Sequence, residues 1–249
     1  EYVGGVAGMT YATDGSNIEA TNGSVSGEYR TGGFFGYTST VSSVCSKNWH
    51  INKVAVTSTQ SHAGGIAGYA FHIYSIDTLI ENCTLKGPGH VGGFIAQNNL
   101  GTKRIRNLQI KNCTIESTLG TLAGKDQTSS AVGGVIGCEL DTSRQSVQYS
   151  GIAVRNCKIE GPGYVGGFMG ALQYAVSGFV SEKIYIAEDV TVRAKESVAG
   201  GVFGYTDILT LTDSACGATV SAGNNEAGGI IGTDVTKNVA DMVLSDDNF

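Results

Sequence analysis

The 249-residue sequence predicts an all-β fold, namely a parallel β-helix or β-solenoid. A glycine-pair motif recurs eight times, at intervals of 28 to 41 residues, which is typical of chains built from stacked coils. Each interval holds short segments rich in β-branched residues, without the spacing of an amphipathic helix. Apolar residues also fall in columns when the intervals are aligned. We expect three short strands per coil and about seven to eight coils, wound right-handed as crossover rules favour.

The glycine motif has one apolar or small residue, two glycines, two apolar residues and then Gly or Ala, as in residues 91–96. Its two apolar columns are adjacent in the chain, so a straight strand would turn one of them outward. We expect either a bend at the glycines that turns both columns inward, or a cover. The cover would come from the inserts at 39–50, 118–130 and 141–150, or from a partner. The pairs begin at Gly4, Gly32, Gly64, Gly92, Gly133, Gly166, Gly200 and Gly228.

Residues 76–96 show one coil most clearly. A first apolar strand ends at Ile80, a second begins at Asn82, and a third covers 91–96. Between the last two, residues 87–89 read Gly-Pro-Gly, which favours a turn. Related segments recur at 108–115 and 152–170. Because one coil cannot bury its own apolar face, neighbouring coils must stabilise each other, and the stack would be a rod roughly 35 Å long.

Two columns that are small or apolar at every step are assigned to the interior. Polar residues alternate with them and are assigned to a solvated face. The first interior column is Gly23, Val54, Cys83, Cys113, Cys157, Val190 and Ala218, and the second is Val25, Val56, Leu85, Ile115, Ile159, Val192 and Val220.

Composition excludes some classes of function. The chain has 16 basic and 22 acidic residues, a net charge of −6, so it lacks the basic stripe that nucleic acid requires. Nothing in it approaches the roughly 20 apolar residues of a membrane-spanning helix. Because the motif runs from end to end, we expect one domain over residues 1–249. The abrupt start and end of the repeat suggest a segment of a longer protein.

Three cysteines, Cys83, Cys113 and Cys157, share one interior column. They form either a stack of buried thiols or a Cys83–Cys113 disulfide, although in-register strands point both Cβ atoms the same way and would strain that bridge. A metal site needs convergent ligands, so we predict no metal and no cofactor. The remaining cysteines lie off the column and are free or paired: Cys45, Cys138 and Cys216.

Asparagines precede the three column cysteines. Asn82, Asn112 and Asn156 are expected to form a ladder at a coil corner. Asn22, Asn82 and Asn112 also match the glycosylation sequon, so glycan attachment stays open.

Acidic residues do not gather into an evident catalytic pair. Glu188 and Asp189 adjoin near Glu160 and Arg193, but no column concentrates acids as a glycosidase or lyase requires. A second scattered group is Glu139, Asp141, Lys125 and Asp126. His62 and His90 share a column in which no carboxylate sits beside them, and they are expected to be surface residues. We therefore predict no catalytic residue.

Aromatic residues are the best candidates for ligand binding. Tyr37 and Tyr69 hold the same place after consecutive glycine motifs, and Phe71 and Tyr174 lie just beyond such a place. Exposed rings on a rigid sheet can stack on sugars or contact a protein; otherwise these rings cover a corner of the coil.

The motif at 165–170, Val-Gly-Gly-Phe-Met-Gly, resembles the hallmark of the GLUG repeat family, and the resemblance covers essentially the whole chain. It implies a large exported bacterial surface protein of adhesin-like type. The family has no shared catalytic residues. The Asn that often follows its motif is matched here only near Asn98, and the cysteine column is not part of its pattern.

These features together predict a structural or adhesive segment of an extracellular or cell-surface protein, with glycans or surface proteins as partners. Two alternatives are a polysaccharide lyase or hydrolase of the β-helix type, and a filament subunit that self-associates end to end.

Overall fold

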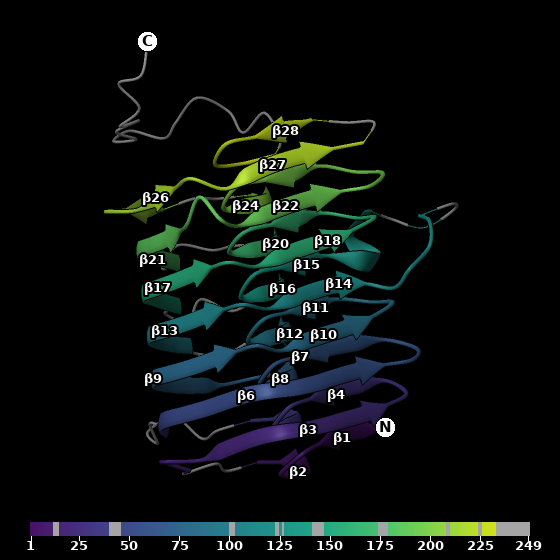
Figure 1. Cartoon of the computed structure of the whole chain (residues 1–249), viewed down its shortest axis with the longest axis vertical. Coiled ribbons are helices and arrows are strands. Elements are labelled where there is room, and N and C mark those ends of the chain that lie inside the picture. The colour runs from purple at the N-terminus through teal and green to yellow at the C-terminus, as the bar shows by residue number, and fades with distance from the viewer. Residues whose placement is uncertain are drawn as a thin grey trace.

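A computed structural model of the chain describes residues 1–11, 15–39, 46–99, 103–122, 125, 127–140, 147–173, 179–207, 210–223 and 226–232. Over these residues, parallel β-strands are stacked as a β-solenoid, from the N-terminal strands at one end to the last described strand at the other (Figure 1). The predicted all-β, parallel architecture is confirmed. The described part contains no α-helix and one 3-10 turn, η1 (Gln127–Ser130).

The described strands form three parallel sheets. The glycine sheet consists of β1 (Tyr2–Gly4), β4 (Arg30–Gly32), β7 (His62–Gly64), β11 (Val91–Gly92), β15 (Val132–Gly133), β19 (Val165–Gly166), β23 (Ala199–Gly200) and β28 (Ala227–Gly228). The second sheet consists of β2 (Ala7–Thr10), β5 (Phe35–Thr38), β8 (Ala67–Ala70), β12 (Ile95–Asn99), β16 (Ile136–Leu140), β20 (Met169–Gln173) and β24 (Phe203–Thr206).

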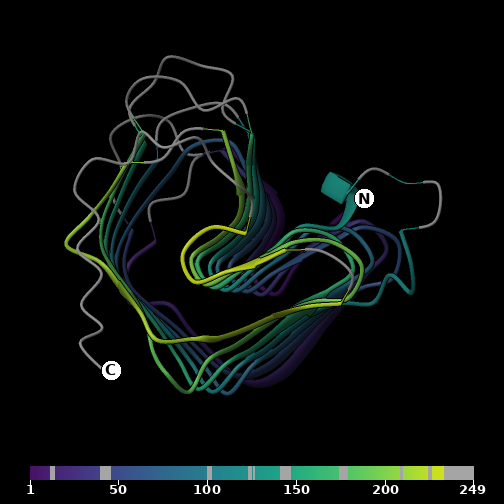
Figure 2. The same cartoon turned by 90° about the horizontal axis from the view of Figure 1, so that it is seen from above.

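The third sheet is the widest. It consists of β3 (Glu19–Gly27), β6 (Ser46–Ser58), β9 (Ile73–Glu81), β10 (Thr84–Gly87), β13 (Lys103–Lys111), β14 (Thr114–Ser117), β17 (Val147–Arg155), β18 (Lys158–Gly161), β21 (Phe179–Ile186), β22 (Thr191–Ala194), β25 (Leu211–Thr212), β26 (Ala215–Cys216) and β27 (Thr219–Ala222). Viewed down the stack, successive turns superpose (Figure 2).

The strands pair in the register that the sequence columns predict. Leu85 lies opposite Val56 on one side and Ile115 on the other, and Ile115 lies opposite Ile159. Leu85, Val56 and Ile115 are fully buried. Each interior residue therefore packs on its counterpart in the next turn.

A bend at the glycine pair turns both neighbouring apolar columns inward. Phe94 and Ile95 are adjacent in the chain, yet both are 0% exposed. A Cβ on Gly93 would collide with the carbonyl oxygen of Gly134 in the next turn. Glycine is thus required for the close approach of successive corners, and of the expected explanations the bend is the one observed.

The same bend creates an inward fold on the outside of the solenoid (Figure 2). A Cβ on Gly36 of β5 would meet the backbone of Tyr2 and Val3 in β1, so the glycine sheet and the second sheet come close there. Side chains on their outer faces meet across this fold, for example Tyr164 and Tyr205, whose ring centroids lie 4.9 Å apart. We call this region the notch.

Two further corners depend on left-handed backbone. At one, the positive-φ residues are Asn22, Lys53, Asn82, Asn112 and Asn156. At the other they are Asn17, Asn48, Asp77, Asn107, Gly151, Lys183 and Asp213. Each corner places two outward residues between two inward ones, as in buried Ile80, Glu81, Asn82 and buried Cys83. The simple two-residue alternation is therefore interrupted at each corner.

The predicted three strands per coil and seven to eight coils are not confirmed. Between consecutive glycine pairs, β12, β13 and β14 follow β11, so the middle turns have four strand segments. In contrast, β6 runs through its corner as one 13-residue strand that pairs with both β9 and β10. The stack makes about six turns. Six turns carry a long strand in the wide sheet. In the turn after them, the strands that pair with β21 are β25 and β26, which have only two residues each.

Among the described residues, no helix is long and apolar enough to cross a membrane.

Candidate functional site

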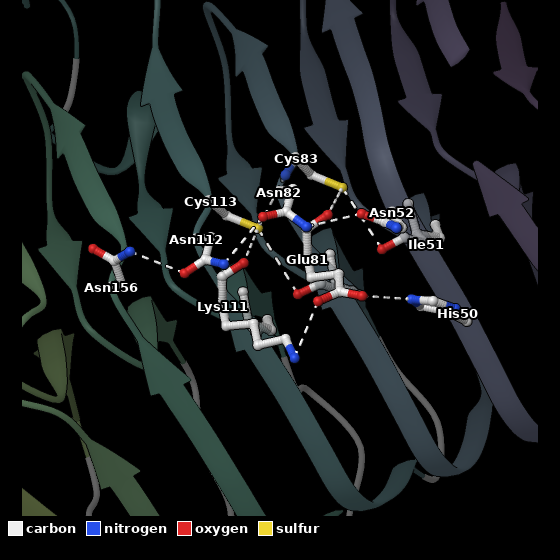
Figure 3. A network of polar contacts seen from close by, with 12 residues as sticks. His50, Ile51, Asn52, Glu81, Asn82, Cys83, Lys111, Asn112, Cys113 and Asn156 are labelled. Carbon is white, nitrogen blue, oxygen red and sulfur yellow. Dashed lines mark hydrogen bonds and ion pairs between the residues drawn. The ribbon is translucent and has the colours of Figure 1, made fainter. Parts of the chain in front are cut away.

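A row of asparagine side chains runs along the stack and is here called the asparagine row: Asn52, Asn82, Asn112 and Asn156 (Figure 3). Nδ2 of Asn82 donates to Oδ1 of Asn52 at 2.9 Å, and Nδ2 of Asn112 donates to Oδ1 of Asn82 at 3.0 Å. Nδ2 of Asn156 donates to Oδ1 of Asn112 at 2.9 Å. The predicted ladder is confirmed, and Asn52 is a member that the sequence did not reveal.

Local backbone geometry explains why asparagine recurs here. Asn82 and Asn112 have φ of 56° and 55°, a left-handed conformation that asparagine tolerates better than most residues. In β6, Lys53 occupies the corner instead, and the preceding Asn52 supplies the amide. At the far end, Oδ1 of Asp189 accepts the backbone N–H of Asn156 at 2.7 Å.

The row also bears on glycosylation. A glycan attaches through Nδ2, the atom by which Asn82 and Asn112 donate along the row. Successive rungs are only about 4.8 Å apart, so neighbouring glycans would collide. Row formation and glycosylation therefore compete at these two positions.

A row of three thiols lies just inside the asparagine row, here called the thiol row: Cys83, Cys113 and Cys157. All are free cysteines, 2 to 3% exposed. Each Sγ donates to the carbonyl two residues earlier, with Cys83 reaching Glu81 at 3.1 Å and Cys113 reaching Lys111 at 3.2 Å. The structure thus has the stack of buried thiols, and it has no Cys83–Cys113 disulfide.

The thiols influence one another's ionisation. Hydrogen bonding to Cys113 lowers the pKa of Cys83 and the pKa of Cys157. The same contacts raise the pKa of the Cys113 thiol, which lies between the other two. The outer thiols therefore ionise before the middle one. Of the cysteines off the column, Cys138 and Cys216 are also free, and Cys45 lies outside the described residues.

An open hollow of about 400 Å³ lies at this corner. Its lining includes Asn112, Asn156, Cys113, Cys157, Lys158 and Asp189. A second, smaller hollow of about 140 Å³ lies on the wide sheet and includes Arg106 and Glu182.

Ion pairs run across the outer face of the wide sheet beside the asparagine row (Figure 3). His50 contacts Glu19 through Nδ1 at 3.2 Å and Glu81 through Nε2 at 3.0 Å. Nζ of Lys111 lies 3.0 Å from Glu81. Hydrogen bonds from Lys111 and then His50 lower the pKa of Glu81. This carboxylate is thus held ionised between two basic groups.

Glu160 and Asp189, which were considered as acids of a lyase, have other contacts. Burial acts to raise the pKa of Glu160, but Lys158 at 2.8 Å and Lys195 at 3.0 Å together lower it. Asp189 accepts from the asparagine row. The described contacts therefore do not join Glu160 and Asp189 as a catalytic pair. Asp126 and Asp141 lie outside the described residues.

Glu139 occupies a place that the sequence did not indicate. It is 0% exposed, and its Oε2 accepts from Tyr149 Oη at 2.6 Å and from Asn98 Nδ2 at 2.8 Å. Asn98 and Glu139 face each other in register on β12 and β16. Adjacent coils here share a polar interior position, which at Glu139 is concealed by the apolar neighbours Cys138 and Leu140.

The predicted ligand-binding residues Tyr37 and Tyr69 come together in the notch. Their rings stack with centroids 5.5 Å apart and an interplanar angle of 11°. The guanidinium carbon of Arg30 lies 4.2 Å from the Tyr69 centroid. Tyr2 packs edge-on against Tyr37 at 5.4 Å, and the 65% exposed Tyr11 lies 5.8 Å from it. We call these five residues the tyrosine row.

Of the other two predicted ligand-binding residues, the structure describes Phe71, which is not a member of this row. Phe71 packs edge-on against His72, with centroids 4.8 Å apart. Tyr174 lies outside the described residues. Sequence reasoning missed Tyr2 and Arg30, although their position two residues before a glycine pair was the available signal.

His62 and His90 are packed in the notch and are not free surface side chains. Their rings stack 4.6 Å apart at 8°. Nδ1 of His62 accepts the backbone N–H of His90 at 2.9 Å, and Nδ1 of His90 accepts that of Ala131 at 3.3 Å. Burial lowers the pKa of His62 to about 2 and of His90 to about 4. Both imidazoles are thus neutral structural acceptors at pH 7.

Within the described ranges, no three or more His, Cys, Asp or Glu side chains surround a point where they could hold one metal ion together.

Comparison with known proteins adds little beyond these features. No family model matches the chain, and no curated protein matches it. Among solved structures, it is similar to a provisionally assigned immunoglobulin A1 protease from Bacteroides ovatus, with 12% identity and a TM-score of 0.43. The match covers 82% of this chain and 65% of the other.

Proposed function

We propose that this chain is a structural repeat segment of an extracellular or cell-surface protein, a rigid stalk that also offers an outer face for adhesion. The observation that carries the proposal is the continuous in-register stacking of turns. Polar side chains on the outside bind their counterparts in neighbouring turns, as in the asparagine row, and so reinforce the long axis.

The electrostatics fit a load-bearing role better than a catalytic one. Glu81 and Glu160 are each held by two basic groups on the outer face. Ion pairs at an exposed surface contribute little stability singly, about 0–1 kcal/mol each, whereas Glu160 is itself only 5% exposed. Three of the four contacts join neighbouring turns, the exception being Lys158–Glu160 within β18, and both carboxylates are already paired with basic groups. We therefore propose that the chain is not an enzyme.

The eight glycine motifs support membership of the GLUG repeat family, which we include in this proposal. The proposal also includes the right-handed winding and the cell-surface location. In place of three strands per coil, we propose a coil with three sides, in which each middle turn contributes two strand segments to the wide sheet.

Pulling the chain from its two ends in a single-molecule force experiment tests the stalk. A stack of turns should unravel in steps of about one period, each releasing roughly 100 Å of chain for 28 residues at about 3.6 Å per residue. Extension without force peaks would contradict a load-bearing role. Release of reducing ends or unsaturated sugars from a panel of polysaccharides, lost in Glu160→Gln, would favour the lyase or hydrolase instead.

For adhesion, the tyrosine row is the proposed binding face. A glycan array probed with the full chain should show binding that Tyr69→Ala weakens at least tenfold, whereas Phe71→Ala, outside the row, should not. Equal binding by both variants would remove the row from the proposal. Electron microscopy at high protein concentration tests the filament alternative, which predicts particles joined end to end.

A further inference from the structure

We propose that the thiol row binds a soft monovalent cation of the Cu(I) class, one ion between Cys83 and Cys113 and one between Cys113 and Cys157. Each ion would have two sulfur ligands in a line. Three free, buried thiols on consecutive coils are the starting observation.

The stacking geometry suits two-coordinate ions. The residues that follow the cysteines pair directly, Thr84 with Thr114 and Thr114 with Lys158, so the thiols repeat at the strand spacing of about 4.8 Å. Twice a metal–thiolate bond of about 2.3 Å is about 4.6 Å, nearly the same length. An ion midway between two sulfurs would reach both, with the S–metal–S line along the stack.

This geometry also selects the ion. A ladder of parallel side chains cannot surround a tetrahedral ion, in agreement with the absence of a three-ligand group within the described ranges. Thiolates are soft ligands that favour Cu(I), and a d10 monovalent ion accepts two collinear ligands. Hard ions such as Mg²⁺ and Ca²⁺ require oxygen ligands and would be rejected.

The binding step is a proton-for-metal exchange. The first ion breaks two S–H bonds, forms two S–Cu bonds and releases two protons to solvent. The second ion uses the Cys113 sulfur as a bridge and releases the third proton, from the remaining outer thiol. Three thiolates and two cations leave a net charge of −1. The backbone N–H of Cys83 lies 3.4 Å from Cys113 Sγ and would stabilise the bridging thiolate.

The corner provides a route of entry. The hollow of about 400 Å³ is lined by Cys113 and Cys157, together with Asp189. The thiol protons now bind the carbonyls of Lys111 and Arg155, at 3.2 and 3.1 Å, and these contacts would open as the metal replaces the protons.

Titration of the reduced full chain with Cu(I), supplied anaerobically as its acetonitrile complex against a chromophoric Cu(I) chelator, tests the proposal. We expect the wild type to withdraw two ions per chain, Cys83→Ser and Cys157→Ser one each, and Cys113→Ser none. Cys138→Ser, a buried thiol outside the row, should retain both ions. Circular dichroism verifies that each variant is folded.

X-ray absorption of the loaded protein should show two sulfur neighbours per copper and no third ligand. Retention of two ions by Cys113→Ser would overturn the proposal. So would three-sulfur coordination, or complete loss of copper from the wild type to the chelator.

Discussion

At the scale of the residue, the structure depends on side chains that tolerate left-handed backbone and bind their counterparts in the next turn. Asn112 does both: its φ is 55°, and its amide accepts from Asn156 and donates to Asn82. The asparagine ladder was predictable from the repeated Asn-Cys pairs. The second left-handed corner was not, because it uses Asn, Asp, Gly and Lys in turn.

Replacing Asn112 should separate these two contributions. Asn112→Gly keeps the positive φ and loses the amide, whereas Asn112→Ala loses both. We expect Ala to cost about 1–2 kcal/mol more than Gly in the free energy of unfolding, because an L-residue is strained there. Urea unfolding measures the difference. The exposed Gln109→Ala on β13 is the control, and equal costs for Gly and Ala would show that φ is unimportant.

The histidine pair predicts loss of stability in acid. The pKa of His90 is lowered to about 4 in the folded chain, against about 6.5 when unfolded, so the unfolded state binds more protons below pH 6.5. Stability is therefore full above pH 6.5 and falls as the pH drops towards 4. Arg30 nearby further disfavours protonation of His62.

The variant His90→Gln removes one of the two titrating groups. Between pH 7 and pH 5, its free energy of unfolding should fall by about 2 kcal/mol less than that of the wild type. Urea unfolding at the two pH values gives this difference directly. An identical pH dependence in both proteins would place the acid sensitivity elsewhere in the chain.

At the scale of the element, the glycine pair decides the shape of each turn. It lets successive corners approach so closely that both apolar columns, such as Phe94 and Ile95, face the core. The sequence indicated that bend as one of two explanations for the adjacent columns, but only coordinates could select it. The same fold brings Tyr37 and Arg30 of one turn together with Tyr69 of the next.

Substitution within the pair should be far more damaging than elsewhere. A Cβ on Gly93 would collide with the Gly134 carbonyl, a backbone atom that cannot move alone. We expect Gly93→Ala to lower the thermal midpoint by more than 10 °C or to prevent folding. Gly120→Ala, whose Cβ would meet nothing within 4 Å, should change it by no more than about 2 °C. Similar midpoints would refute the close-approach argument.

At the scale of the whole molecule, turns add along one axis and each packs mainly on its neighbours. The parallel stack and its register were predictable because the apolar columns repeat through the whole chain. The number of segments per turn was not, since corners such as Asn82 split a strand in one turn while β6 remains continuous in another. The burial of Glu139 was not predictable either, because it depends on the residue that lies opposite in the neighbouring turn, which the local sequence pattern does not give.

Removal of one whole period should be tolerated. Deleting residues 64–91 joins Ala63 to Gly92, and since Ala63 pairs with Val91 and Gly64 with Gly92, the register is kept. We expect a folded, cooperative unfolding transition by circular dichroism. Deletion of residues 64–77, half a period, should abolish it, and survival of both proteins would argue against a stack in which register matters.

The most direct test of the stacked architecture is a set of distances along one outward column. Spin labels attached by a chemistry that spares the six native cysteines would pair Ser24 with Lys158 and Ser24 with Thr219. Lys158 is four rungs from Ser24 and Thr219 is six, so pulsed electron spin resonance should give separations near 19 and 29 Å at about 4.8 Å per rung. A second distance equal to or shorter than the first would contradict the stack.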